Sequence, residues 1–109
     1  MNRPYVAIAD LRALLSAIGP ESIVSRTIFN EAAGRAILFG FAPGQELSEH
    51  TAAMAAILHI LEGHATLTLG GDAMEAAPGA LVYMTPNLPH SVYAHDQVVM
   101  LLTMLKGTN

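Results

Sequence analysis

The chain has 109 residues, of which 52% are hydrophobic and only 13% are charged, and its formal net charge is −4. This composition is too apolar for an intrinsically disordered chain, and the length suits one hydrophobic core. The five basic residues are scattered along the chain, which argues against nucleic acid or an anionic membrane surface as a partner. The chain contains no cysteine, which excludes disulfides, thiolate catalysis and cysteine metal sites.

The distribution of apolar residues gives two further expectations. The longest uninterrupted apolar run covers residues 52–58, far short of the roughly 20 residues that span a membrane. Because no basic segment followed by an apolar leader precedes the folded region, we expect a cytoplasmic protein. A chain this short and this apolar must expose apolar atoms, so we also expect a homodimer that covers part of that surface.

The first 21 residues predict a short N-terminal helix or an irregular arm that packs on the rest of the domain. Four apolar residues recur at the spacing of one helix face: Leu11, Leu14, Leu15 and Ile18. Asp10 precedes them as a candidate N-cap. Gly19 and Pro20 follow as candidates for the end of the helix.

Residues 22–109 change character and predict an all-β fold. Short runs rich in β-branched and aliphatic residues alternate with glycine and proline punctuation, a pattern typical of a sandwich or a jelly-roll barrel. The expected strands are residues 23–30, 35–42, 46–52, 54–61, 64–69, a short polar strand before Pro78, and then 80–85, 90–94 and 97–106. The last of these is apolar on both faces, so it is either central in a sheet or covered by a partner.

Two stretches carry spaced glycine and histidine residues. In the first stretch, Gly44 is followed after five residues by His50, and Ala56 is followed after six residues by Gly63. The numbers of residues between these positions in the sequence define the first motif.

In the second stretch, Gly79 opens a run that reaches a turn at Pro86 and Asn87 and then His90. Asn is one of the few residues besides glycine that tolerates a positive φ in such a turn. Together the two motifs resemble those of the cupin superfamily, and the chain looks like the small single-domain bacterial cupins of unassigned function. The resemblance covers roughly residues 35–105 and implies an RmlC-like jelly roll, a double-stranded β-helix barrel, for residues 22–109.

The resemblance also implies a metal site, but only half of its donors are present. In cupins the metal is usually held at positions that correspond here to His50, Ala52, Ala56 and His90. Alanine has no donor atom, and two imidazoles alone make a weak site. We therefore expect either one weakly held divalent transition metal ion (Zn, Ni, Mn, Fe or Cu) or none.

Two other histidines are candidates to complete the site. If positions 56, 58 and 60 face the barrel interior, strand alternation turns His59 away from it. A one-residue bulge would reverse that direction and create a three-histidine site of His50, His59 and His90. His64 begins the following strand and is expected to be a partly exposed turn residue.

Three functions stay open on this basis. The first is a small-molecule-binding cupin with an apolar pocket, whose expected lining is Ala52, Ala56, Leu58, Ile60, Tyr83 and Met84. The second is a metalloenzyme of the dioxygenase or isomerase kind that uses the three-histidine site. The third is a structural or regulatory module whose interior has no ligand, because the same fold serves unrelated functions.

Overall fold

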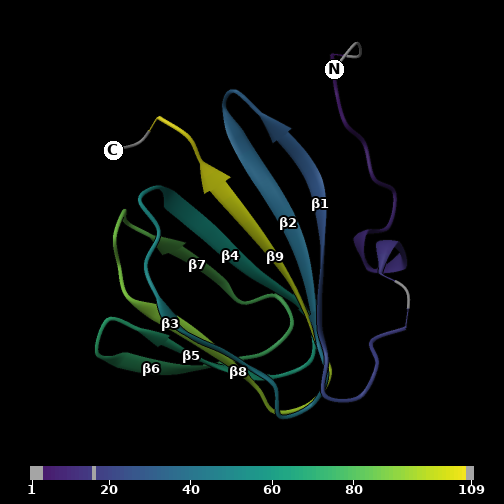
Figure 1. Ribbon diagram of the computed structural model, residues 1–109, viewed down its shortest axis with the longest axis vertical. Coiled ribbons are helices and arrows are strands. Elements are labelled where there is room, and N and C mark those ends of the chain that lie inside the picture. The colour runs from purple at the N-terminus through teal and green to yellow at the C-terminus, as the bar shows by residue number, and fades with distance from the viewer. Residues whose placement is uncertain (1–3, 16, 108–109) are drawn as a thin grey trace.

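Nine antiparallel strands form the part of the chain that the computed structural model describes, residues 4–15 and 17–107 (Figure 1). Their bounds are β1 Ile23–Glu31, β2 Gly34–Phe41, β3 Glu46–His50, β4 Ala55–Glu62, β5 Ala65–Leu69, β6 Asp72–Ala76, β7 Leu81–Met84, β8 His90–Ala94 and β9 Val98–Leu105. These bounds follow the expected strands closely because glycine, proline and polar turns separate them in the sequence.

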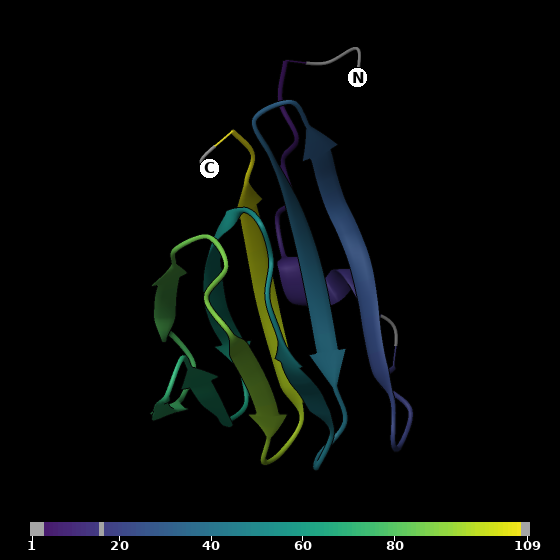
Figure 2. The same cartoon turned by 60° about the vertical axis from the view of Figure 1, so that its left-hand side comes forward.

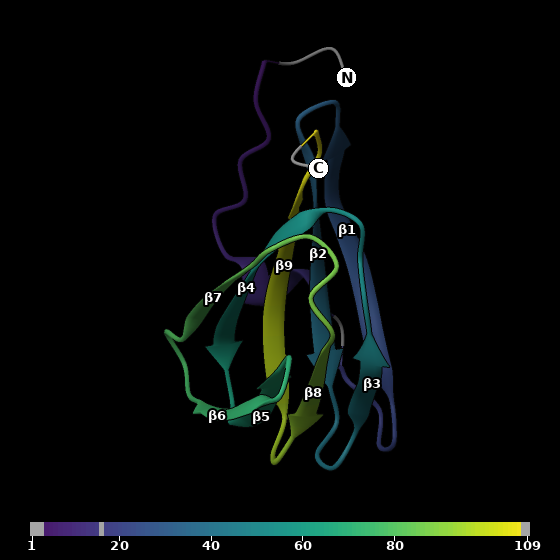
Figure 3. The ribbon, with the colours of Figure 1, turned by 90° about the vertical axis from the view of Figure 1, so that its left-hand side faces the viewer.

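The strands form two sheets that face each other as a jelly roll (Figures 2 and 3). The five-stranded sheet has the order β1-β2-β9-β4-β7, and the four-stranded sheet has the order β3-β8-β5-β6. The predicted all-β barrel is therefore confirmed. The last strand, β9, lies in the middle of the larger sheet, which explains why both of its faces are apolar.

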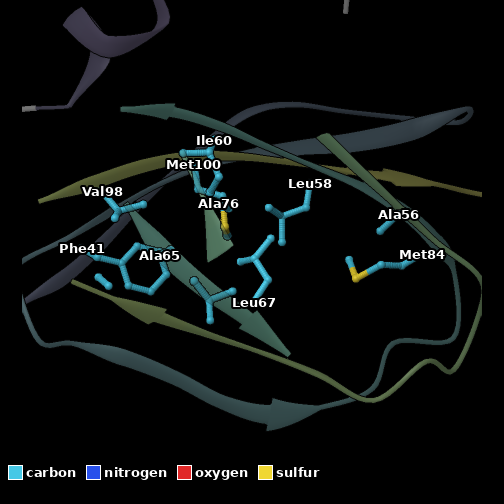
Figure 4. Close-up of a cluster of buried hydrophobic side chains, with 12 residues drawn as sticks. Phe41, Ala56, Leu58, Ile60, Ala65, Leu67, Ala76, Met84, Val98 and Met100 are labelled. Atoms are coloured by element: carbon cyan, nitrogen blue, oxygen red, sulfur yellow. The ribbon is translucent and has the colours of Figure 1, made fainter. Parts of the chain in front are cut away.

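Alternate residues of the strands fill the space between the sheets. The largest fully buried side chains there are Phe41, Leu58, Ile60, Leu67, Met84, Val92, Val98 and Met100. Figure 4 shows Ala56 and Met84 together at one end of this cluster, and Phe41, Ala65 and Val98 at the other. The interior is thus a packed core along most of its length.

The barrel has two ends that differ in their connections. At the mouth, residues 51–54 join β3 to β4 and residues 85–89 join β7 to β8, and the Asn87 N–H donates to the Ala52 carbonyl across 2.7 Å. At the opposite, closed end, residues 63–64 join β4 to β5 and residues 95–97 join β8 to β9. Gly63 has a φ of 81°, and a Cβ there would overlap the Gln97 carbonyl oxygen, so this end is tightly packed.

The N-terminal segment is an arm with one helical turn. A 3₁₀ turn, η1, covers Leu11–Leu14, and the Asp10 side chain accepts the Arg12 N–H as the predicted N-cap. The predicted continuation to Ile18 and a helix end at Gly19 are wrong, because the backbone is already extended at Leu15. A helix this short gains little from its own hydrogen bonds.

The arm packs instead on the outer face of the five-stranded sheet. The Leu15 and Ile18 side chains lie against Gly40 of β2, where any larger residue would meet them. The Arg26 guanidinium of β1 donates to the Leu14 carbonyl across 3.1 Å. Residues 1–3 and 16 of the predicted arm lie outside the described residues. Within the described part, no helix has the length and apolar character to cross a membrane.

A two-histidine candidate site at the mouth of the barrel

His50 and His90 face each other on neighbouring strands at the mouth. His50 is the last residue of β3, His90 is the first of β8, and the two are direct register partners. Their ring centroids are 4.1 Å apart and the ring planes are inclined by 58°. His90 is only 6% exposed, whereas His50 is exposed, so the pair links the buried interior to solvent.

A bulge in β3 turns His50 toward its partner. The register of β3 and β8 shifts between Leu47, which packs on the core, and His50. Without the extra residue, two side chains separated by an odd number of positions would point to opposite faces of the sheet. The bulge therefore places both Leu47 and His50 on the interior face.

Backbone carbonyls fix the tautomer of both rings. The His50 Nδ1 lies 2.9 Å from the Ser48 carbonyl oxygen, and the His90 Nδ1 lies 2.9 Å from the Leu88 carbonyl oxygen. A carbonyl can only accept, so each Nδ1 carries the proton and each neutral ring has its lone pair on Nε2. Histidines that bind a metal through one ring nitrogen usually donate such a hydrogen bond from the other, which fixes the orientation of the ring. The same arrangement leaves Nε2 able to accept a hydrogen bond from an N–H or O–H group of a ligand.

Comparisons with known proteins agree with this architecture. The family model described as Cupin domain matches residues 37–105, well over half of the chain. The chain belongs to the cupin family. No curated protein matches this cupin.

Solved structures of other bacterial proteins share the fold. A conserved protein of unknown function from Streptococcus pyogenes is 27% identical with a TM-score of 0.84, over 100% of this chain and 95% of that one. A cupin superfamily protein from Desulfitobacterium hafniense is 22% identical with a TM-score of 0.81, over 96% and 92% of the two chains. A protein from Thermus thermophilus is 23% identical with a TM-score of 0.80, over 90% and 95%.

The residues present do not fit the four-ligand metal site of the family. Ala56 lies at the start of β4, 4% exposed, and Ala52 lies in the β3–β4 connection, so neither position supplies a donor. The described residues contain no group of three or more His, Asp or Glu side chains placed to hold one ion. The mouth of this cupin offers two imidazole nitrogens and two alanines.

The structure does not bring His59 to the histidine pair. Ala56, Leu58 and Ile60 belong to the interior cluster, and His59 alternates with them on the outer face of β4, between Leu81 and Leu101. The bulge that would have reversed this direction does not occur before His59. The expected three-histidine arrangement is therefore not formed.

The expected pocket residues divide into three groups. Leu58, Ile60 and Met84 lie in the packed core, with Met84 beside Ala56 near the mouth and Ile60 toward the closed end (Figure 4). Ala52 and Ala56 lie at the mouth itself. Tyr83 is 58% exposed because it pairs with Ile57 on the outer face, so its place in an interior pocket was a wrong expectation.

Two polar clusters were not foreseen from the sequence. At the closed end, His64 Nδ1 lies 2.8 Å from Asp96 Oδ2, and the His64 backbone N–H donates to Asp96 Oδ1 across 2.6 Å. These hydrogen bonds hold the pKa of the Asp96 carboxyl below its usual range. The residues are 32 positions apart, and only the pairing of the two turns brings them together.

The second cluster lies on the outer face of the four-stranded sheet. Thr66 Oγ1 donates to Glu75 Oε2 across 2.7 Å and accepts from His95 Nε2 across 2.7 Å. The Tyr93 ring meets His95 edge-on at 5.1 Å between centroids. All four side chains come from neighbouring strand ends, and the exposed Glu75 makes this a solvated surface network.

Proposed function

We propose that this cupin binds a small molecule at the mouth of its barrel. His50 and His90 hold a polar group of that molecule, either directly or through a weakly bound divalent metal ion. The observation that carries the proposal is the pair of facing imidazoles, each with Nδ1 bonded to a backbone carbonyl and Nε2 left as a lone-pair donor.

The surroundings of the pair favour a ligand with an apolar body. Ala52 and Ala56 occupy the positions where related proteins carry donor side chains, and alanine leaves more space than histidine or glutamate. The floor beneath them is built from Met84 and Leu58, both at most 2% exposed. An apolar site with a few convergent polar groups is the usual form of a small-molecule site.

The metalloenzyme alternative has less support. It requires a third protein ligand, because catalytic transition metals are commonly held by three side chains with open positions for substrate. His59 was the candidate for that ligand, and it lies on the other face of β4. A module with no ligand remains the competing hypothesis, and ligand binding separates the two.

Metal content and ligand binding of matched histidine variants test the proposal. We would measure bound metal by elemental analysis, and measure thermal stabilisation by Zn²⁺, Mn²⁺ and a panel of small aromatic and aliphatic compounds. The variants are His50→Ala, His90→Ala and, as the control, His59→Ala. The control removes the same side chain from the outer face of β4.

The expected result is that at least one metal or compound stabilises the wild type and His59→Ala equally. His50→Ala and His90→Ala should lower its affinity at least tenfold, as loss of a direct contact to a charged or metal-bound group does. Equal binding by all four proteins, or no binding by the folded wild type, would contradict the proposal.

We also propose that this cupin forms a homodimer through the outer face of the five-stranded sheet. At the end of that face away from the arm, β4, β7 and β9 carry no Asp, Glu, Lys or Arg; the residues there are Ile57, His59, Leu81, Tyr83, Leu101, Thr103 and Leu105, whereas Glu62 at the other end of β4 pairs with Val99 and contacts Arg12 of the arm. Leu81 is 62% exposed and Tyr83 is 58% exposed. A two-fold contact sets a patch against its own copy, so an uncharged patch is compatible with itself.

Sedimentation velocity tests the dimer. Leu81→Lys places a charge next to its own copy at such an interface and should convert a dimer to a monomer. Thr68→Lys places the same charge on the outer face of the other sheet and should leave the dimer intact. A monomeric wild type at micromolar concentration, or a dimer unaffected by Leu81→Lys, would refute this interface.

A further inference from the structure

Arg35 carries a buried hydrogen-bond donor without a partner. Its Nε is inaccessible to solvent and has no acceptor within hydrogen-bonding distance. Other basic side chains in the described part of the chain are engaged: Arg12 with Glu62, Arg26 with the Leu14 carbonyl, and Lys106 with Asn30. A guanidinium is always charged, and a buried N–H without an acceptor is costly, so such a group calls for an explanation.

The position of Arg35 relates it to the candidate site. Arg35 is the second residue of β2 and pairs with Met104 of β9. The same row continues across the sheet to Ala56 of β4 and then to Met84 of β7. This row of the five-stranded sheet faces the interior, since Met84 and Ala56 belong to the core cluster and Met104 packs against it. It is the row nearest the mouth, where His50 and His90 lie on the other sheet.

The chemistry of the two groups is complementary to one class of ligand. The Arg35 guanidinium presents a planar set of donors that matches a carboxylate, and it repels a metal ion. The two histidines present Nε2 acceptors, which take a hydrogen bond from a hydroxyl or amino group. A molecule with a carboxylate at one end and such a donor at the other would satisfy both sides of the mouth.

We propose that the ligand of this cupin is a small hydroxycarboxylic acid or a close relative, with its carboxylate on Arg35 and its hydroxyl on the His50–His90 pair. The inference rests on the proposed small-molecule function and names the substrate class. Ala56 lies in the same row as Arg35, so the apolar body would lie against its methyl group between the two polar ends. Arg35 brings one positive charge to the site, which one carboxylate balances.

A factorial set of probes tests each end separately. The probes are 4-hydroxybenzoate, 4-hydroxybenzamide, which lacks the charge, and benzoate, which lacks the hydroxyl; 6-hydroxyhexanoate and its amide supply an aliphatic body. Binding is measured by calorimetry on the wild type, Arg35→Gln and His50→Ala. Arg26→Gln serves as the control, because it removes a guanidinium from the outer face.

In the wild type and Arg26→Gln, we expect at least one hydroxycarboxylate to bind at least tenfold more tightly than its amide. Arg35→Gln should abolish the preference for the acid over its amide and keep the preference for 4-hydroxybenzoate over benzoate. His50→Ala should abolish the preference for the hydroxylated acid and keep the preference for the acid over its amide. If the acids bind no better than their amides, or if Arg35→Gln binds them as the wild type does, the inference is overturned.

The outcomes separate this inference from the proposed function. If neutral probes or metal ions bind in a way that depends on His50 but not on Arg35, the proposed function is supported and the proposed carboxylate site at Arg35 is wrong. If no probe or metal ion shows binding that depends on His50, both proposals are wrong.

A stability measurement excludes a purely structural role for Arg35. Arg35→Met removes the unpartnered donor and keeps the apolar stem, so the ligand-free variant should unfold at the same temperature as the wild type or higher. A clear loss of stability would mean that Arg35 is needed by the fold itself, for example through an ordered water, and would contradict the proposal.

Discussion

The two ends of the barrel each hold a histidine pairing, and the partners of Nδ1 make them different. At the closed end, His64 Nδ1 meets the Asp96 carboxylate, and both groups are largely in solvent. At the mouth, Nδ1 of His50 and of His90 is bonded to a backbone carbonyl, and the rings face each other. The first arrangement joins two turns, whereas the second leaves two lone pairs directed away from the backbone.

This difference shows why the same residue type serves structure at one end and is a candidate for binding at the other. At the closed end the His64–Asp96 contact joins two connections of the chain, and both side chains lie largely in solvent. At the mouth, two rings with Nε2 free face each other beside the buried core, so two acceptor nitrogens lie close together. A packed interior separates the two ends.

The largest effect should come from the interior between the ends. Leu58 lies in the middle of β4 and is 1% exposed. Leu58→Ala should lower the free energy of unfolding by about 2–5 kcal/mol, because it removes buried methyl groups and leaves a cavity. Chemical denaturation monitored by circular dichroism measures this. A cost below about 1 kcal/mol would mean that the interior is not closely packed and that the mouth opens into a deeper cavity.

The tight packing of the closed end predicts the next largest effect. Gly63 and Gly44 both have a φ of 81°, but a Cβ at Gly63 would approach Asp96 Oδ1 to 2.8 Å and the Gln97 carbonyl more closely still, whereas one at Gly44 meets nothing within 4 Å. Gly44→Ala should cost about 1–2 kcal/mol of unfolding free energy from the left-handed backbone alone. Gly63→Ala should cost about 1–3 kcal/mol more, through the overlap. Equal costs in the two variants would show that the turns at this end are loosely packed.

Restoring a donor at the mouth should change its binding preference. Ala56→Glu introduces a carboxylate at the position where the family usually carries one, so it should raise the affinity for Zn²⁺ or Mn²⁺ at least tenfold, about 1.4 kcal/mol. The same charge should weaken the binding of carboxylate probes, because it occupies the site and repels them. Calorimetric titrations measure both affinities.

Ala56→Gln is the control, since it fills the same space without the charge. If Ala56→Gln and Ala56→Glu bind the metal equally, the introduced carboxylate does not reach the histidine pair, and position 56 is not part of the site.

The sequence predicted the framework of this molecule better than its site. Strand bounds and fold followed from alternation and turn residues, and Asn87, expected to tolerate a positive φ, has a φ of 67°. Alternation also predicted that His59 would face outward. It did not predict the direction of His50, which depends on the bulge after Leu47, and only the motif resemblance indicated it.

The remaining differences have a common physical cause. The arm matched a helical pattern, but contacts with Gly40 of β2 decide its conformation, and those contacts are invisible in a local pattern. The role of Arg35 depends on its register with Met104 and Ala56, which comes from pairings far apart in the chain. Tyr83 and Met84 were both expected to line the pocket, but strand alternation puts neighbouring residues on opposite faces.

The smallest predicted effect concerns the ion pair at the closed end, and its sign follows from the lowered pKa of Asp96. The His64 side chain and backbone N–H both bond the Asp96 carboxylate, so the folded state favours the ionised form. The resulting stabilisation is present at pH values above 3.8, the usual carboxyl pKa, and is lost as the pH falls through the lower pKa of the folded protein. Asp96→Asn should therefore melt at a slightly lower temperature than the wild type at pH 6, and the two melting temperatures should converge as the pH falls further below 3.8. Asp72→Asn, at the exposed start of β6, makes the same change in net charge and should show no such convergence. A difference for Asp96→Asn that persists undiminished at pH 2 would mean that the side chain acts through its shape and not its charge, and the contrast between the two histidine pairings would then rest on the mouth alone.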